Sequence, residues 1–147
     1  MEDQGKPLEI AVALGVDPAT LVAAVVKVGS TGPDKLEVAG GLRKAPLELV
    51  PAVTVDLEVL ARAEIIIEGH VLPEVREQEG PFGENTGYYF SNVSPVVEVT
   101  AVTHRKDFIY PSLCPWTVDV DNLLSLASGT ELLGHLQQQM HGAVALE

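Results

Sequence analysis

The sequence has little of several things that common functions require. Its 147 residues include one cysteine, Cys114, which excludes an internal disulfide and a multi-cysteine zinc or iron–sulfur site. Lysine and arginine total 9 against 21 acidic residues, so the net charge is −12 and the basic surface that nucleic acid requires is absent. No apolar run reaches the roughly 18 residues of a membrane span. The acidic N-terminus does not resemble a signal peptide, so we expect a cytoplasmic protein.

Most of the chain is expected to form strands. Alternating and β-branched residues predict strands over 8–14, 47–50, 53–59, 63–72 and 95–105. In the last of these, Val97, Val99 and Ala101 are expected on one face. A loop is expected over 73–89 because this segment holds two prolines and several glycines, and a short strand is expected over 107–113.

Helices are expected on either side of these strands. Asp17 as N-cap predicts a helix over 18–28, with proline in its first position. A second short helix is expected over 36–43, broken near its two glycines, and a longer one from about 121 to 140. Helices segregated from several strands indicate an α+β fold with a barrel-like or sandwich sheet, in a single domain over 1–147.

The segment EGPFGE holds two carboxylates, Glu79 and Glu84. A fully extended chain would separate them by roughly 17 Å, but Pro81 and Gly83 favour a turn that brings both to the same rim of the sheet. Two carboxylates held close repel each other, so one can keep a proton to donate while its partner stays ionised and binds a cation. The alternative is a solvated acidic loop, because a chain with 21 acidic residues holds many such pairs.

Further segments combine with EGPFGE. It is followed by NTGYY and preceded by VDLEV and AEIIIEGHVL, and the chain also contains ALGVDPATLVAA and PVVEVTAVTHRKDFIYP. In their order along the chain, these segments resemble the UbiD family, which includes 3-polyprenyl-4-hydroxybenzoate decarboxylase of ubiquinone biosynthesis. The resemblance covers nearly the whole chain. It implies the central split β-barrel segment of a longer enzyme, with a short N-terminal helix and a longer C-terminal helix, between an N-terminal α/β domain and a C-terminal domain that dimerises.

The resemblance also implies a chemistry and its residues. Family members use prenylated FMN, with Mn²⁺ and K⁺, to decarboxylate small aromatic or α,β-unsaturated carboxylic acids, and they are homo-oligomeric. Glu84 matches the family's proton donor, and Glu79 matches the carboxylate that pairs with an arginine of the N-terminal domain. Leu124 falls where the family places an apolar residue that faces the substrate. Because the arginine and most flavin contacts lie outside these residues, we expect no activity of this chain alone.

One position departs from the family pattern. Lys35 stands where family members carry a metal-binding glutamate, before the Ala-Gly of LEVAGG. A lysine puts a cation where a cation would bind, so no metal is expected there, and the four histidines show no metal-ligand spacing. Lys35 then contacts the flavin phosphate directly, marks a divergent or inactive phosphate subsite, or lies on the surface. The divergent subsite leads to an alternative function: a non-enzymatic accessory subunit, or a degenerate flavin-binding-like domain that keeps only the fold.

Overall fold

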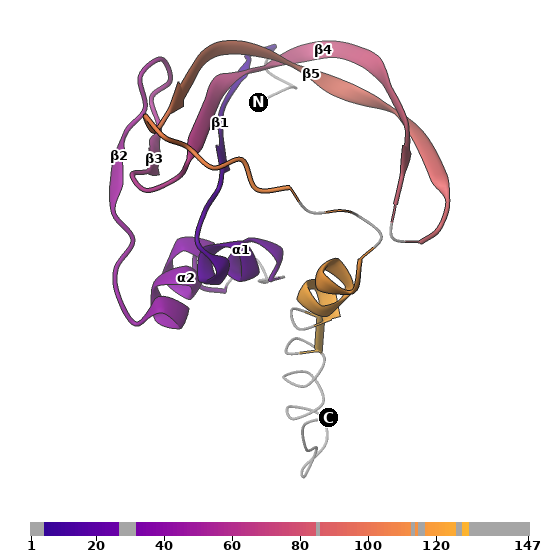
Figure 1. The fold of residues 1–147 in the computed structure, drawn as a ribbon. Helices are drawn as coiled ribbons and strands as arrows, with labels where there is room; N and C mark the ends of the chain where they lie inside the picture. The colour runs from indigo at the N-terminus through magenta and orange to yellow at the C-terminus, as the bar shows by residue number, and fades with distance from the viewer. Residues whose placement is uncertain are drawn as a thin grey trace. The chain divides into compact units, whose positions relative to one another are not determined.

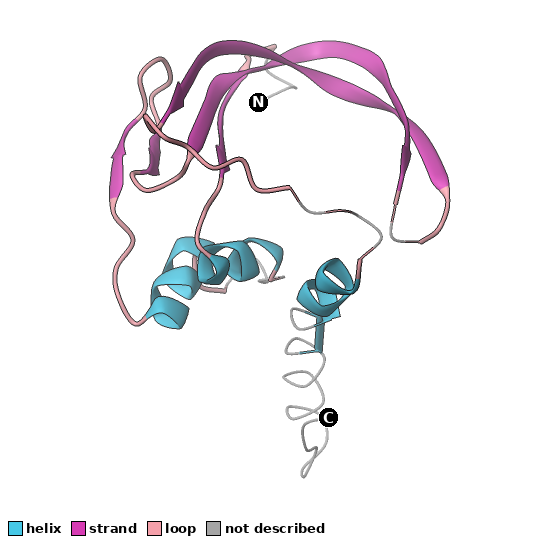
Figure 2. Ribbon diagram, viewed as in Figure 1, coloured by secondary structure: helices cyan, strands magenta, loops and turns pink. Residues whose placement is uncertain are grey.

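The computed structural model describes residues 5–26, 32–84, 86–112, 114, 117–125 and 128–129. The chain divides into two compact units, one of residues Met1–Val16 and Glu48–Ser112, the other of residues Asp17–Leu47 and Leu113–Glu147. The first contains strands and the second helices (Figure 2). This division confirms the predicted α+β class, whereas a single domain over 1–147 stays a prediction.

The first unit contains two antiparallel sheets (Figure 1). The larger sheet has the strand order β1-β4-β5, formed by β1 (Leu8–Leu14), β4 (Ile65–Gly83) and β5 (Tyr89–His104). The smaller sheet pairs β2 (Leu49–Pro51) with β3 (Glu58–Leu60). Within the described residues these strands form two open sheets and no closed barrel.

The strand register sorts the side chains of the larger sheet into two faces, because residues paired across strands share a face. What we call the core face carries small and polar residues beside one isoleucine: Ala11, Ala13, Ile66, Glu68 and Ala101. Val59 and Ala63 pack there with Ile66 to form the buried core. What we call the aliphatic face carries Leu8, Ile10, Val12, Leu14, Ile65, Ile67, Val71, Val97, Val99 and Val102.

A β-bulge in β5 changes which residues share a face. The neighbours Glu68 and Gly69 pair with Ala101 and Val99, which leaves Thr100 as an extra residue. The prediction that Ala101 shares a face with Val99 is therefore wrong. The extra residue inverts the alternation, so that Val99 lies on the aliphatic face and Ala101 on the core face.

Two segments predicted as strands lack that conformation. Residues 53–56, the first part of the strand predicted over 53–59, form bends between β2 and β3, where backbone N–H groups donate to the carboxylate of Glu68. Residues 107–112 have no strand partner among the residues that the structure describes, and the N–H of Ile109 donates to a carboxylate oxygen of Glu64 at 3.0 Å. In both segments a side-chain carboxylate accepts from backbone N–H groups that a neighbouring strand would otherwise bind.

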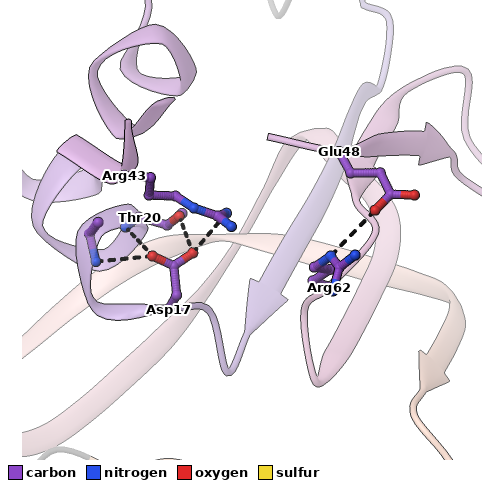
Figure 3. Close-up of polar contacts among 6 residues, drawn as sticks. Asp17, Thr20, Arg43, Glu48 and Arg62 are labelled. Atoms are coloured by element: carbon purple, nitrogen blue, oxygen red, sulfur yellow. Dashed lines mark hydrogen bonds and ion pairs between the residues drawn. The ribbon is translucent and has the colours of Figure 1, made fainter. Parts of the chain in front are cut away.

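The second unit contains α1 (Pro18–Val25) and α2 (Lys35–Arg43). Asp17 is the N-cap of α1, as predicted, and accepts hydrogen bonds from the backbone of the first turn and from the Thr20 hydroxyl (Figure 3). The Arg43 guanidinium lies 3.1 Å from the same carboxylate. Burial raises the pKa of Asp17, but the hydrogen bonds from Thr20 and the charge of Arg43 outweigh it, so that the pKa lies below its usual value.

The helix α2 is continuous, and the predicted break near Gly40 and Gly41 is wrong. Glycine in a helix interior costs about 1 kcal/mol relative to alanine, too little to interrupt a helix that has caps at both ends. Asp34 caps the N-terminus, and Lys44 ends the helix in the left-handed region with φ of 55°. Residues 118–125 are also helical, and most of the longer helix predicted to about 140 lies outside the described residues.

Candidate active site

The candidate site lies on a two-stranded extension that we call the distal arm, residues 76–83 of β4 and 89–95 of β5 (Figure 1). The loop predicted over 73–89 is wrong for most of its length, because β4 continues to its pairing with the start of β5. Pro73 and Pro81 each lie inside a register shift of the ladder. Proline is tolerated at such irregularities because its missing N–H removes no ladder hydrogen bond there.

A β-bulge on the distal arm places both candidate carboxylates on one face. In a regular strand, residues five apart point to opposite faces. Here Glu79 pairs with Asn92 and Phe82 with Phe90, so β4 holds one more residue than β5 between these pairs. Glu84 follows Phe82 by two residues and therefore shares its face and that of Glu79. The sequence predicted that a turn at Pro81 would bring the two carboxylates together, whereas in the structure a β-bulge places them on one face.

Two glycines allow this geometry. Gly80 has φ of +86°, and a Cβ built on it would lie 2.6 Å from the carbonyl oxygen of Phe90. Gly87 has φ of +85° and donates its N–H to the carbonyl oxygen of Glu84 at 3.0 Å, in the turn that joins the two strands. The N–H of Glu84 donates in turn to the carbonyl oxygen of Tyr88 at 3.1 Å. Any other residue at Gly80 would strain the bulge that aligns the carboxylates.

Glu79 has a hydrogen-bond partner that the sequence did not reveal. The Ser94 hydroxyl donates to Oε2 of Glu79. Ser94 lies two residues from Asn92, the strand partner of Glu79, so this contact agrees with the face assigned by the register. Glu79 itself is exposed, whereas Glu84 is half-buried. The carboxylates thus stand in unequal surroundings on one surface.

Aromatic side chains share the face of these carboxylates. The register places Phe82, Phe90 and Tyr88 on it, and their exposed fractions are 36%, 41% and 70%. An acidic face bordered by partly exposed rings can contact a flat unsaturated molecule while offering it a carboxyl group.

The remaining predicted site residues belong to the helical unit. The ammonium group of Lys35 donates to the carbonyl oxygen of Ala24 at 2.7 Å, near the C-terminal end of α1, where a cation is favoured. Leu124 lies in the helical residues 118–125 and is 39% exposed. A phosphate contact for Lys35 and a substrate contact for Leu124 stay predictions.

Sequence inspection missed Glu68, the most deeply buried charged residue described, with 1% of its surface exposed. Its oxygens accept from the N–H of Val53 at 2.9 Å and from the N–H and hydroxyl of Thr54 at 2.6 and 2.7 Å. The Val53 hydrogen bond, together with those from Thr54, lowers the pKa of Glu68 although burial acts to raise it. A lone glutamate in the run IIIEGHV was the available signal.

Comparison with known proteins identifies the family. A family model described as "UbiD: 3-octaprenyl-4-hydroxybenzoate carboxy-lyase Rift-related domain" matches residues 1–117. The chain belongs to the UbiD family. The UbiD-class enzyme HmfF from Pelotomaculum thermopropionicum, solved in complex with prFMN, matches with a TM-score of 0.89 and 49% identity over 93% of this chain. The 3,4-dihydroxybenzoic acid decarboxylase AroY of Klebsiella pneumoniae matches with a TM-score of 0.86 and 36% identity over 96% of this chain.

The chain spans only part of its UbiD relatives. It covers 32% of the HmfF chain and 31% of the AroY chain. An uncharacterized protein of Archaeoglobus fulgidus is 47% identical over 110 residues, which are 74% of this chain and 23% of that protein. About two thirds of a UbiD-class polypeptide therefore lies outside the region that this chain represents.

The described residues fit the proton transfer in the flavin chemistry of UbiD enzymes better than they fit the binding of a metal ion. The distal arm supplies carboxyl groups and aromatic rings, which suit proton transfer to a bound unsaturated acid. Within the ranges that the structure describes, no cluster of three or more histidine, cysteine or acidic side chains could hold a metal ion. The same ranges contain no helix long and apolar enough to cross a membrane.

Proposed function

We propose that this chain is the central domain of a UbiD-class decarboxylase that acts on a small aromatic or α,β-unsaturated carboxylic acid. The observation that carries the proposal is the bulge in β4, which puts Glu79 and Glu84 on one face beside aromatic rings. When bound, prenylated FMN supplies the electron sink for loss of carbon dioxide. The protein must then deliver one proton to the carbon that has lost its carboxylate.

Glu84 is the residue proposed to deliver that proton. The carbon–carboxylate bond breaks and its electron pair stays on carbon, and the Glu84 carboxyl O–H transfers its proton to that carbon. Glu84 leaves the step as a carboxylate and is protonated again by solvent. Its backbone is held on both sides, by the hydrogen bond to Tyr88 and the one from Gly87, so the side chain extends from a fixed point of the turn.

Glu79 is the residue proposed to hold an arginine from the N-terminal domain. Ser94 donates to one carboxylate oxygen, Oε2, and among the described residues no other side chain donates to Oε1, which can receive a guanidinium. A carboxylate that is held in one orientation restricts the position of its bound cation more than a freely rotating carboxylate does. In this scheme Glu79 orients the arginine by accepting from its guanidinium.

The test is a comparison of variants in the complete UbiD-class protein. Glu84→Gln keeps the shape of the side chain but removes the transferable proton, so carbon dioxide release from 3,4-dihydroxybenzoate, the acid named for AroY, should fall by about 100-fold or more. Substrate binding, followed by ultraviolet titration, should persist. Glu77→Gln, an exposed glutamate of the same arm, is the matched control and should change little. A Glu84→Gln enzyme with normal turnover would refute the proton-donor role.

The alternative, a non-enzymatic domain that keeps only the fold, is favoured by one observation. The resemblance places Lys35 where family members carry a metal ligand, and its ammonium group donates to the carbonyl oxygen of Ala24. Isothermal titration of this chain with Mn²⁺ should show no tight site, and Lys35→Ala should not change that. If Lys35→Glu in the complete protein raises retention of flavin or Mn²⁺, the phosphate subsite has diverged. Retention by the unaltered complete protein would favour the enzyme.

A further inference from the structure

The chain passes three times between the unit that contains the strands, which we call the strand unit, and the helical unit. The crossings follow Val16, Leu47 and Ser112. Within the strand unit, a segment next to each crossing is hydrogen-bonded to the same short turn, residues 61–64, which joins β3 to β4. We call this turn the junction turn. Three connections that are far apart in sequence therefore share one point of attachment.

Backbone hydrogen bonds tie the junction turn to the first two connections. The N–H of Glu64 donates to the carbonyl oxygen of Leu14, the last residue of β1, at 3.0 Å. The N–H of Ala61 donates to the carbonyl oxygen of Glu48 at 3.0 Å, where the chain re-enters the strand unit. The carboxylate of Glu48 also pairs with Arg62 at 3.3 Å (Figure 3). Both side chains of that pair are largely exposed, so the backbone hydrogen bond is the stronger tie.

Gly15 allows the first connection to pass close to Glu64. Its φ is +71°, and its carbonyl oxygen accepts from the N–H of Glu64 at 3.2 Å. A Cβ built on Gly15 would collide with the Cβ and Cγ atoms of Glu64. Glycine is therefore required twice here, for the backbone conformation and for the close approach.

The side chain of Glu64 holds the third connection. Its Oε1 accepts from the guanidinium of Arg105 at 2.9 Å, and its Oε2 accepts from the N–H of Ile109 at 3.0 Å. The side chain of Glu64 is only 16% exposed, which partly shields these charge-assisted hydrogen bonds from water. Among the residues that the structure describes, Glu64 is the only hydrogen-bond partner that residues 106–112 have outside their own segment. The path of this segment therefore depends on one carboxylate.

We propose that the junction turn is a clamp that fixes where the helical unit is attached to the strand unit, and that Glu64 is its positioning residue. Glu64 carries the proposal because it binds the end of β1 through its backbone and the segment after β5 through its carboxylate. Lys35 and Leu124, the predicted phosphate and substrate contacts, both belong to the helical unit. The clamp would thus position both of them without touching either. The proposal rests on contacts within the strand unit and not on the proposed function.

Spin labels test the proposal in this chain. In a Cys114→Ser background, Val53→Cys places one label on the strand unit and Val118→Cys places the other on the helical unit. Val53 and Val118 are each 71% exposed. Double electron–electron resonance then measures the distribution of distances between the two labels. Glu64→Ala is the test variant, and Glu58→Ala, which removes an exposed carboxylate from β3, is the matched control.

The distance distribution should become at least about twofold broader in Glu64→Ala and should stay unchanged in Glu58→Ala. Hydrogen exchange of the Ile109 amide should be about tenfold faster or more, because its N–H has lost its acceptor. An unchanged circular dichroism spectrum shows that the strands remain folded, so that loss of the fold does not explain the broadening. If Glu64→Ala does not fold, Ile109→Pro removes the N–H that donates to Glu64 and should broaden the distribution in the same way.

Three results would overturn the proposal. The first is a distribution of equal width in Glu64→Ala and in the unaltered chain, whether narrow or broad. The second is equal broadening in Glu58→Ala, which would mean that any lost carboxylate loosens the attachment. The third is unchanged exchange at Ile109 in Glu64→Ala, which would mean that the carboxylate does not hold the segment after β5.

Discussion

Glu68 and Glu79 are eleven residues apart on the same strand, yet they stand in opposite surroundings. Glu68 is buried at the centre of the three-stranded sheet and accepts hydrogen bonds from Val53 and Thr54. Glu79 is exposed on the two-stranded arm, and its described partner is Ser94. A carboxylate whose oxygens are fully engaged serves the fold, whereas one with an oxygen left open can serve a ligand. The predictions that follow test whether this distinction holds.

The largest effect is expected from Glu68→Ala. The substitution removes the acceptor that holds the backbone N–H groups of Val53 and Thr54, and it empties a position that is 1% exposed, where lost packing is costly. The melting temperature should fall on the order of 10 °C, measured by circular dichroism. Glu98→Ala removes an exposed carboxylate from the same sheet and should change the melting temperature by a few degrees at most. Equal losses in the two variants would contradict the distinction.

The contribution of Glu68 to stability should also be visible when the pH is lowered. The folded pKa of Glu68 lies below its ordinary value of 4.5, so the carboxylate stabilises the fold above that value. This contribution is lost as the pH falls through the lower, folded pKa. Urea unfolding between about pH 7 and about pH 3 should show a steeper loss for the unaltered chain than for Glu68→Gln, which has no proton to take up. Parallel curves would show that Glu68 is not a source of the acid sensitivity.

Substitution of Asp17 should reduce stability by less than substitution of Glu68 and by more than substitution of an exposed carboxylate. It accepts several hydrogen bonds, as Glu68 does, but it caps a surface helix and its side chain is 39% exposed. Asp17→Ala should lower the free energy of unfolding by about 1 kcal/mol, the usual value of an N-cap. Asp17→Asn keeps an oxygen that can cap the helix and should recover most of the loss. A larger loss for Asp17→Ala than for Glu68→Ala would reverse the expected order.

The sequence predicts the elements whose information is local. The alternation over 8–14 and the Asp17-Pro18 start signal correspond to β1 and α1. The long hairpin was missed because Pro73 and Pro81 indicate a loop when read alone, and only pairing with β5 shows that each lies in a register irregularity. Strand pairing is non-local, and no window of sequence contains it.

In the candidate site, too, the sequence predicts what depends on local residues and misses what depends on strand pairing. EGPFGE identified Glu79 and Glu84, but the way they come to share a face depends on a bulge that exists only in the paired ladder. Ser94 and Glu68 were missed for a related reason. A serine opposite a glutamate, and a buried glutamate beside free N–H groups, are recognised from their partners and not from their own neighbours in sequence.

The smallest effect on stability and the most specific effect on function are expected from Ser94→Ala. The contact lies on the exposed arm, so the free energy of unfolding should change by no more than about 0.5 kcal/mol. If Ser94 orients Glu79 for the arginine, turnover of the complete protein should fall several-fold without a matching rise in KM, since the substrate still binds but is held less accurately. Ser94→Thr retains the hydroxyl and should restore turnover.

Ser91→Ala provides the control on the other face of the same strand. Ser91 lies three residues from Ser94, so the alternation of β5 points it away from Glu79. It loses the same hydroxyl at an exposed position and should affect neither stability nor turnover. If Ser91→Ala slows turnover as much as Ser94→Ala, the arm tolerates no substitution and the hydroxyl has no particular role. If neither variant slows turnover, Glu79 is oriented by the arginine alone, and its open oxygen is a consequence of exposure and not of function.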